Sequence, residues 1–152
     1  MTSKEINEYV HKLEIIWYAE NRPNIPEQVI PRKVYNCKKA NSLTKAVMDT
    51  TKWLGGIADR RSSEGRYRAG ESYKVGNTTH QGEGTWLPGV NKGIADIELA
   101  FPGRMIFVEI KIGADRQSDV QKQFQRKVEM SGNEYYIVKT FDDFIEQIVQ
   151  LV

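Results

Sequence analysis

Charged side chains lie within an apolar stretch of the chain, ADIELAFPGRMIFVEIKIG, which runs from Ala95 to Gly113. The pattern predicts two strands joined by a turn, and side chains on a strand alternate between its two faces. Glu109 and Lys111 therefore share one face, about 6–7 Å apart along the strand. Asp96 and Glu98 share a face of the preceding strand. A hairpin that aligns these faces would gather two or three carboxylates and one ammonium at one edge of a sheet.

Clustered carboxylates repel one another unless a cation lies among them. A hard divalent cation, Mg²⁺ or Mn²⁺, prefers oxygen ligands. Asp96, Glu109 and the backbone carbonyl of Ile110 would supply three, with Glu98 as a further candidate. A protonated Lys111 cannot bind the cation, but it can orient an attacking water or stabilise charge on a reacting phosphate. The alternative is a cross-strand salt bridge on a solvated face, and the spacing alone is compatible with both.

The surrounding elements must position these residues. The hairpin turn falls at Pro102-Gly103, and a helix follows the second strand. Ser118 and Gln121 form a capping-box pattern at the start of that helix, and Gly132 ends it. The branched side chains of the second strand lie on the face opposite the charged residues, so we expect them to pack against helices: Ile106, Val108, Ile110 and Ile112.

The C-terminal segment predicts one more strand and one more helix. EYYIVKT has the composition of a strand. Thr140 and Asp143 form a second capping box, which opens a helix from Phe141 to Leu151. The apolar face expected for this helix carries Phe144, Ile148 and Leu151.

The N-terminal part predicts two helices separated by a proline-rich connector. Apolar residues recur at helical spacing from Lys4 to Glu20, and three prolines follow within NRPNIPEQVIPR. The first helix either packs on the rest of the chain or forms the seam of a homodimer. A second helix is expected to begin at Asn41 or Ser42, which are good N-caps, and to end at Gly55-Gly56.

A short strand in GIADRRSS and a long loop or loose hairpin at 63–92 complete the order. From residue 38 onward this order is αβββαβα, which predicts an α/β or α+β domain with a small mixed sheet flanked by helices. The expected organisation is an N-terminal helix and connector at 1–37 and one domain at 38–152.

Composition limits the function classes. The 152 residues include 28% charged and 39% hydrophobic residues, which is typical of a globular domain. Cys37 is the single cysteine, so an internal disulfide and a zinc framework are excluded. No apolar run has the length of a membrane span and the N-terminus lacks the apolar centre of a signal peptide, so we expect a cytoplasmic protein without a membrane partner.

The positive charge is concentrated in the middle of the chain. Residues 38–92 contain 10 basic and five acidic residues, whereas the net charge of the whole chain is +2. This segment is either a surface for a polyanion such as DNA or a solvated loop that is basic. The predicted DNA-binding residues are Arg60, Arg61, Arg66, Arg68, Lys74 and Lys92.

The order of Asp96 and then Glu109-Ile110-Lys111 at the end of an apolar strand resembles the PD-(D/E)XK nuclease superfamily. A Gly-x-x-Asp turn from Gly93, and the Ser-x-x-Gln helix start, are similar to the VRR-NUC subgroup found in small phage and bacterial nucleases. The resemblance covers roughly residues 39–152. It implies a restriction-endonuclease-like core.

The resemblance also implies residue roles. Asp96 and Glu109 would bind the metal, Lys111 would assist the nucleophilic water, and Gln121 would brace the site. The chain departs from the family pattern at Ala95, where the motif has proline, and in the second helix, which lacks the early glutamate of many members.

Together these observations predict a metal-dependent DNA nuclease that hydrolyses phosphodiester bonds, with structure-specific cleavage as one form of that activity. The setting would be a bacterial or phage-infected cell. The alternative is a catalytically weak or inactive DNA-binding or assembly module with a nuclease fold. The sequence leaves open the geometry of the substrate, endo- or exonucleolytic action, the number of metals and the oligomeric state.

Overall fold

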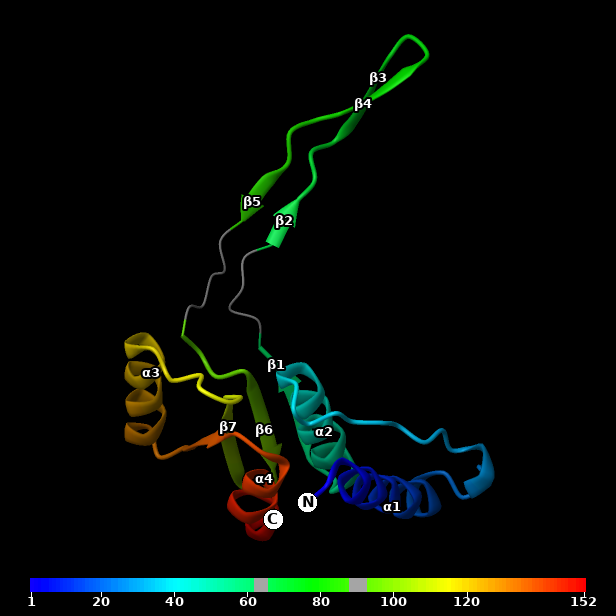
Figure 1. Ribbon diagram of the computed structural model, residues 1–152, viewed down its shortest axis with the longest axis vertical. Helices are drawn as coiled ribbons and strands as arrows, with labels where there is room; N and C mark the ends of the chain where they lie inside the picture. The colour runs from blue at the N-terminus through cyan, green and yellow to red at the C-terminus, as the bar shows by residue number, and fades with distance from the viewer. Residues whose placement is uncertain (62–65, 88–92) are drawn as a thin grey trace.

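Four strands form a small mixed sheet in the computed structural model, which describes residues 1–61, 66–87 and 93–152 (Figure 1). The strand order is β1-β6-β7-β8, with antiparallel pairing from β1 to β7 and parallel pairing between β7 and β8. The predicted hairpin is β6 and β7, which meet at Pro102-Gly103. The strands span Ile57–Arg60 (β1), Ile97–Phe101 (β6), Arg104–Ile110 (β7) and Glu134–Val138 (β8).

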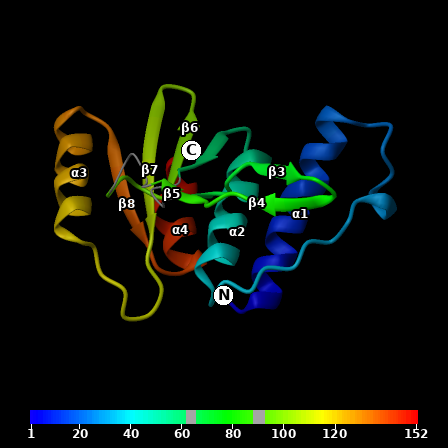
Figure 2. The ribbon, with the colours of Figure 1, turned by 90° about the horizontal axis from the view of Figure 1, so that it is seen from above.

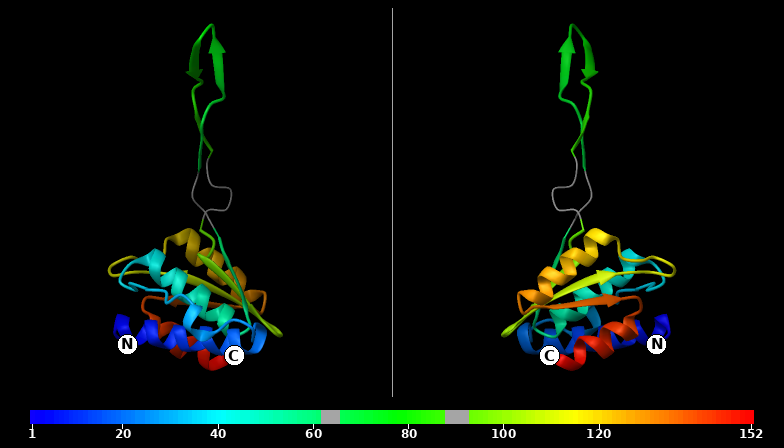
Figure 3. Two further views of the ribbon diagram at one scale, coloured as in Figure 1. Left: turned by 90° about the vertical axis from the view of Figure 1, so that its right-hand side faces the viewer. Right: turned by 90° about the vertical axis from the view of Figure 1, so that its left-hand side faces the viewer.

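Helices cover both faces of this sheet (Figures 2 and 3). Residues of α1, α2 and α4 pack with one face, and α3 packs on the other. The helices span Ser3–Asn21 (α1), Ala40–Trp53 (α2), Asp119–Met130 (α3) and Phe141–Gln147 (α4). With strands β2–β5 set aside, the order from α2 is αβββαβα, so the predicted α+β class and small mixed sheet are confirmed. None of the helices in the described ranges has the length and apolar character needed to cross a membrane.

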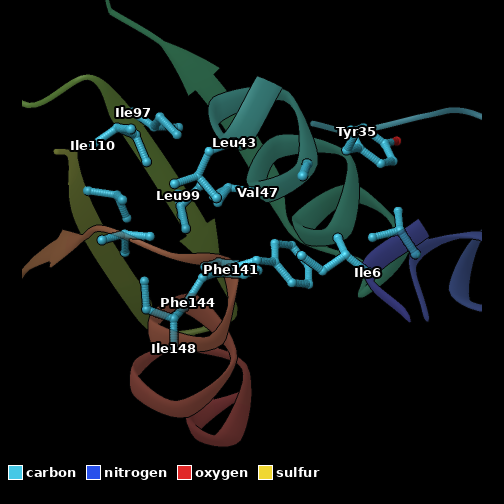
Figure 4. Close-up of a cluster of buried hydrophobic side chains, with 14 of the residues drawn as sticks. Ile6, Tyr35, Leu43, Val47, Ile97, Leu99, Ile110, Phe141, Phe144 and Ile148 are labelled. Carbon is cyan, nitrogen blue, oxygen red and sulfur yellow. The ribbon is translucent and has the colours of Figure 1, made fainter. Parts of the chain in front are cut away.

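The larger hydrophobic core lies between the sheet and α2, α4 and α1 (Figure 4). Strand alternation directs one set of β6 and β7 side chains into it, as predicted. These side chains meet Leu43 and Val47 of α2 and Phe141 and Phe144 of α4, all of which are buried. The buried strand residues are Ile97, Leu99, Ile106, Val108 and Ile110, with Ile112 partly buried beside them.

The N-terminal helix contributes to the same core. Ile6 and Val10 of α1 are buried within it, and Trp17 packs on Trp53 of α2 with ring centroids 5.0 Å apart. Between α1 and α2 the connector contains a 3₁₀ turn at Glu27–Val29. Of the two roles considered for the first helix, packing on the rest of the chain is the one that the structure shows.

The helix ends differ in how well local sequence patterns specify them. Both predicted capping boxes are present, at Ser118 on α3 and at Thr140 on α4. For α2 the predicted end at Gly55-Gly56 is confirmed, but the predicted N-cap was wrong, because the N-cap is Lys39 and the Ser42 hydroxyl instead accepts a hydrogen bond from the Asn36 amide. The final helix ends at Gln147 and continues as a 3₁₀ turn, which leaves Leu151 exposed rather than on the predicted buried face.

Residues 66–87, which we call the β-arm, extend away from the core between β1 and β6 of the sheet (Figures 1 and 3). The β-arm is a hairpin, one of the two forms expected for this region. At its tip Gly76 has the positive φ of 62° that the tight turn needs. Its pairs are β2 (Arg66–Arg68) with β5 (Thr85–Leu87), and β3 (Ser72–Val75) with β4 (Thr78–Gln81).

We expect Gly93→Ala to destabilise the fold more than Gly103→Ala. Both glycines have a positive φ, of 78° and 73°, so alanine costs about 1–2 kcal/mol at either position. A Cβ on Gly103 meets open space, whereas on Gly93 it would lie 2.5 Å from the Val120 side chain and 3.0 Å from the Val120 backbone. This overpacking should add about 1–3 kcal/mol. Urea unfolding of the two variants measures the difference, and equal losses would contradict the close contact between this turn and α3.

Candidate functional site

Asp96 and Glu109 meet at one end of the two central strands of the sheet. Asp96 precedes β6, and the β6–β7 register, which pairs Ile97 with Val108, places Asp96 opposite Glu109. The Asp96 Oδ2 atom accepts a hydrogen bond from the Ile110 amide at 2.8 Å. The structure therefore brings together the two carboxylates that the sequence selected.

Glu109 is enclosed, with 1% of its surface exposed. Its Oε1 atom lies 3.0 Å from the Lys111 Nζ and accepts a hydrogen bond from the Gln121 side-chain amide. Its Oε2 atom accepts a hydrogen bond from the Tyr135 hydroxyl at 3.4 Å. Both carboxylate oxygens thus have protein partners, as a buried charge requires.

Lys111 is also buried, with 7% exposure. Besides Glu109, its ammonium contacts Asp115 Oδ2 at 3.3 Å and Gln121 Oε1 at 3.2 Å. The alternative interpretation, a cross-strand salt bridge on a solvated face, differs from the structure on both points: the ion pair joins two residues of the same chain segment, and both are buried. The face is covered because α3 packs over it through Phe124 and Val128.

Gln121 links the start of α3 to the site. Its Oε1 atom accepts hydrogen bonds from the Ser118 amide at 2.9 Å and from the Lys111 ammonium, and its Nε2 atom donates to Glu109. The capping box was predicted from local sequence. The structure adds that one side chain both caps the helix and bridges the buried ion pair.

Negative groups outnumber positive ones around Glu109, and the pKa values of the site reflect this. Burial, together with the charge of Asp96, raises the pKa of Glu109 to about 7, although Lys111 and Tyr135 oppose the shift. Burial also raises the pKa of Asp96, against the Ile110 amide and the charges of Lys111 and Arg60. Burial alone would lower the pKa of Lys111, but Glu109 and Asp115 outweigh it and the net pKa is raised. The ammonium of Lys111 thus interacts with the carboxylates of Glu109, Asp115 and Asp96.

The donor set fits a hard divalent cation that retains water ligands. Within the described ranges, no group of three or more His, Cys, Asp or Glu side chains has the arrangement of a metal site. The protein would therefore supply the carboxylates of Asp96 and Glu109, with the Ile110 carbonyl as the predicted third oxygen. Mg²⁺ and Mn²⁺ suit such a set, because Mg²⁺ commonly binds one or two carboxylates and keeps several waters.

The further carboxylates considered from the sequence point to other partners. Glu98 Oε2 forms an ion pair with Arg61 Nη2 at 2.5 Å, so the partner that the structure shows for this carboxylate is Arg61. Asp49, the first acid of α2, accepts a hydrogen bond from the Tyr35 hydroxyl at 2.7 Å and lies 3.2 Å from Lys33 Nζ.

The predicted DNA-binding residues separate into two groups. Arg60 and Arg61 are engaged at the end of β1, where Arg60 donates to Asn41 Oδ1 at 2.9 Å and Arg61 pairs with Glu98. Arg68 and Lys74 are exposed on the β-arm. The Arg66 side chain and the whole of Lys92 lie outside the described residues.

Sequence reasoning missed several partners of the site, including Tyr135, Asp115 and Gln117. Tyr135 reaches Glu109 because β8 lies parallel beside β7, with Phe107 opposite Tyr135. The alternation of EYYIVKT implies that Tyr135 and Tyr136 face opposite sides, but only the register of β8 against β7 shows which one meets Glu109. Comparison with known proteins adds no assignment, because the chain matches no model of a known protein family and no curated protein.

We expect Glu109→Gln to change the pH dependence of stability in the metal-free protein. The folded-state pKa of about 7 exceeds the ordinary value of 4.5. Between these values the folded state binds more protons than the unfolded state, so the free energy of unfolding falls as pH rises. The variant lacks this loss and should gain on the order of 2–4 kcal/mol relative to wild type between pH 4.5 and 7.

Urea unfolding in EDTA at several pH values measures this difference. Glu146→Gln on α4 is the matched control, because Glu146 is exposed, and it should follow the wild-type curve. Equal pH slopes in wild type and Glu109→Gln would show that Glu109 is not a buried carboxyl of raised pKa.

Proposed function

We propose that the protein is a divalent-metal-dependent nuclease that hydrolyses DNA phosphodiester bonds, with the VRR-NUC type of PD-(D/E)XK site. The observation that carries the proposal is the buried contact of Glu109 with Lys111 and Gln121, beside Asp96, at one end of the central strands β6 and β7. In this proposal Asp96, Glu109 and the Ile110 carbonyl hold Mg²⁺ or Mn²⁺. The αβββαβα order supports a restriction-endonuclease-like core.

In the proposed reaction, Lys111 and Gln121 would act beside the bound cation. A bound divalent cation supplies Lewis acidity, which activates water and neutralises charge on the phosphate. Lys111 remains protonated, because Glu109 and Asp115 raise its pKa, so it acts as a hydrogen-bond donor and fixed positive charge rather than as a base. Gln121 of α3 would hold Glu109 and Lys111 in place through its side-chain hydrogen bonds to both. The donor is thereby fixed before the substrate arrives, which favours stabilisation of developing charge.

The β-arm gives this proposal a surface for the DNA backbone. The arm is inserted between β1 and β6, so it leaves the core at the sheet end where Asp96 lies. Arg68 and Lys74 are exposed on it, and Tyr73 is 55% exposed and stacked on His80 with ring centroids 5.5 Å apart. Arginine and lysine suit phosphates, and exposed aromatic rings suit unpaired bases.

The second candidate is a DNA-binding or assembly module without nuclease activity. It is favoured by the first turn of α2, which contains no acidic residue and places Asn41 against Arg60. Metal binding separates the candidates. A nuclease of the proposed kind should have a higher melting temperature with Mn²⁺ or Mg²⁺, whereas a module without a metal site should show no shift.

We expect Glu109→Gln and Lys111→Ala each to lower metal-dependent DNA cleavage by about 100-fold or more while the protein stays folded. Glu109→Gln removes the charge that would hold the cation, so it should also abolish the metal-induced rise in melting temperature. The assay uses linear, circular, nicked and four-way-branched DNA with Mg²⁺, Mn²⁺ or EDTA. It thereby also shows which DNA geometry the protein cleaves.

Glu146→Gln and Lys139→Ala are the matched controls for charge and size, because both side chains are exposed and neither contacts the site residues. Each should retain wild-type cleavage. Full activity in purified Glu109→Gln and Lys111→Ala would remove the site assignment, and a wild-type protein that binds DNA without cleavage or metal response would support the second candidate.

We expect the double variant Arg68→Ala/Lys74→Ala to weaken DNA binding to a similar degree on all sequences and to make its salt dependence shallower. Each lost phosphate contact removes about 0.9 from the slope of log affinity against log salt on duplex DNA. Affinity is measured at several salt concentrations with Ca²⁺, which permits binding without cleavage in nucleases of the family that the chain resembles.

Lys4→Ala/Lys12→Ala is the control for total charge, because both lysines are exposed on α1, at the end of the core away from the β-arm in Figure 1. It should leave the slope almost unchanged. An unchanged slope in the β-arm variant would place the DNA elsewhere, with Lys122, Arg126 and Lys127 of α3 as the next surface to test.

A further inference from the structure

Tyr135 brings a hydroxyl group to the candidate site from β8. The residue is 7% exposed, and its ring makes a T-shaped contact with Phe124 of α3 at a centroid distance of 6.3 Å. Phe124 in turn contacts Phe107 of β7 at 5.7 Å. This aromatic packing fixes the ring, so the hydroxyl is held at Glu109 Oε2, 3.4 Å away.

The hydrogen bonds around Tyr135 fix the direction of its proton. The Gln117 side-chain amide donates to the Tyr135 oxygen at 3.5 Å and to Gln125 Oε1 at 2.9 Å. An amide nitrogen has two protons, and a phenol oxygen both accepts and donates. Because Gln117 can only donate to the phenol oxygen from this nitrogen, the hydroxyl proton is directed to Glu109.

We propose that Tyr135 is a positioning residue, whose hydroxyl holds the Glu109 carboxylate in the orientation that binds a divalent cation together with Asp96. This inference rests on the proposed function. Among the described residues, the other partners of Glu109 are Lys111 and Gln121, and both contact its Oε1 atom, which leaves the position of Oε2 dependent on Tyr135. Outer-shell partners of this kind commonly change metal affinity by about 10–100-fold.

The expected effect lies at the lower end of that range. The separation of 3.4 Å is longer than the usual 2.7–2.8 Å of a hydroxyl–oxygen hydrogen bond. We therefore expect Tyr135→Phe to weaken Mn²⁺ binding by about tenfold. Phenylalanine keeps the ring and its contact with Phe124, so the substitution removes the hydroxyl and little else.

The neighbouring tyrosine provides a matched control. Tyr136 also donates its hydroxyl to a carboxylate, that of Glu134, at 2.8 Å. Its ring packs with the core on the opposite face of the same strand. Tyr136→Phe therefore removes the same chemical group from the same strand without touching Glu109, and we expect its Mn²⁺ affinity to equal that of wild type.

The test is calorimetric titration of Mn²⁺ into metal-free wild-type protein, Tyr135→Phe, Tyr136→Phe and Glu109→Gln, with folding checked by circular dichroism. The same proteins are assayed for cleavage over a range of Mn²⁺ concentrations. Tyr135→Phe should need about tenfold more Mn²⁺ for half-maximal cleavage and approach wild-type kcat at saturation. Gln117→Ala, which removes the group that directs the hydroxyl, should shift the affinity in the same direction by less and serves as the second variant if Tyr135→Phe does not fold.

The Mn²⁺ affinities of the two tyrosine variants decide whether Tyr135 positions Glu109. Weaker binding in Tyr135→Phe alone among the two tyrosine variants supports the inference. Equal Mn²⁺ affinity in wild type and Tyr135→Phe overturns it while leaving the proposed nuclease intact, and equal weakening in both tyrosine variants overturns it in favour of a general loss of stability. A wild-type protein that binds no Mn²⁺ overturns the proposed function and this inference together.

Discussion

The buried contact between Glu109 and Lys111 is the constraint on which the rest of the site depends. Removing two charges from water costs several kcal/mol per ion, and their attraction repays this only when further hydrogen bonds complete the geometry. Gln121 and Tyr135 satisfy the carboxylate, while Gln121 and Asp115 satisfy the ammonium. These three residues come from α3 (Gln121), the loop before it (Asp115) and β8 (Tyr135). The pair is therefore stable only if the sheet and α3 assemble around it.

This dependence joins helix formation to the geometry of the site. Gln121 caps α3 through Ser118 and contacts both members of the ion pair, so one side chain serves the helix end and the site together. The turn before β6 packs directly on the same helix, because Gly93 leaves no space for a Cβ against Val120. Asp96, which follows that turn, and Glu109, which α3 covers, are thus positioned by the same helix end. A shift of α3 would therefore disturb the surroundings of both carboxylates.

Local patterns predicted those parts of the molecule that local interactions determine. The β6–β7 hairpin and the caps of α3 and α4 depend on alternation and on contacts three residues apart, and both are readable in the sequence. The start of α2 was wrong because Ser42 bonds to Asn36 in the connector, a contact that intrinsic capping preference does not include. The alternative interpretation that placed Glu109 and Lys111 on a solvated face was wrong, because α3 buries Lys111 and this packing is not visible in the local sequence. Tyr135 was missed because its meeting with Glu109 depends on the parallel register of β7 and β8.

The same site shows a conflict between folding and charge. A carboxyl group whose pKa is raised by burial and by a neighbouring carboxylate lowers the stability of the folded protein at neutral pH. An apolar residue at position 109 would avoid this cost, because it would bring no charge into this buried position. Such violations of otherwise consistent local rules are expected where a protein acts rather than where it merely folds. The proposed divalent cation would relieve the conflict, because it supplies the positive charge that Asp96 and Glu109 together lack. Protons and a metal ion compete for the same carboxylate oxygens. The metal-free site, in which two carboxylates lack sufficient positive charge, would therefore gain more from a bound divalent cation than a site whose charges were already balanced.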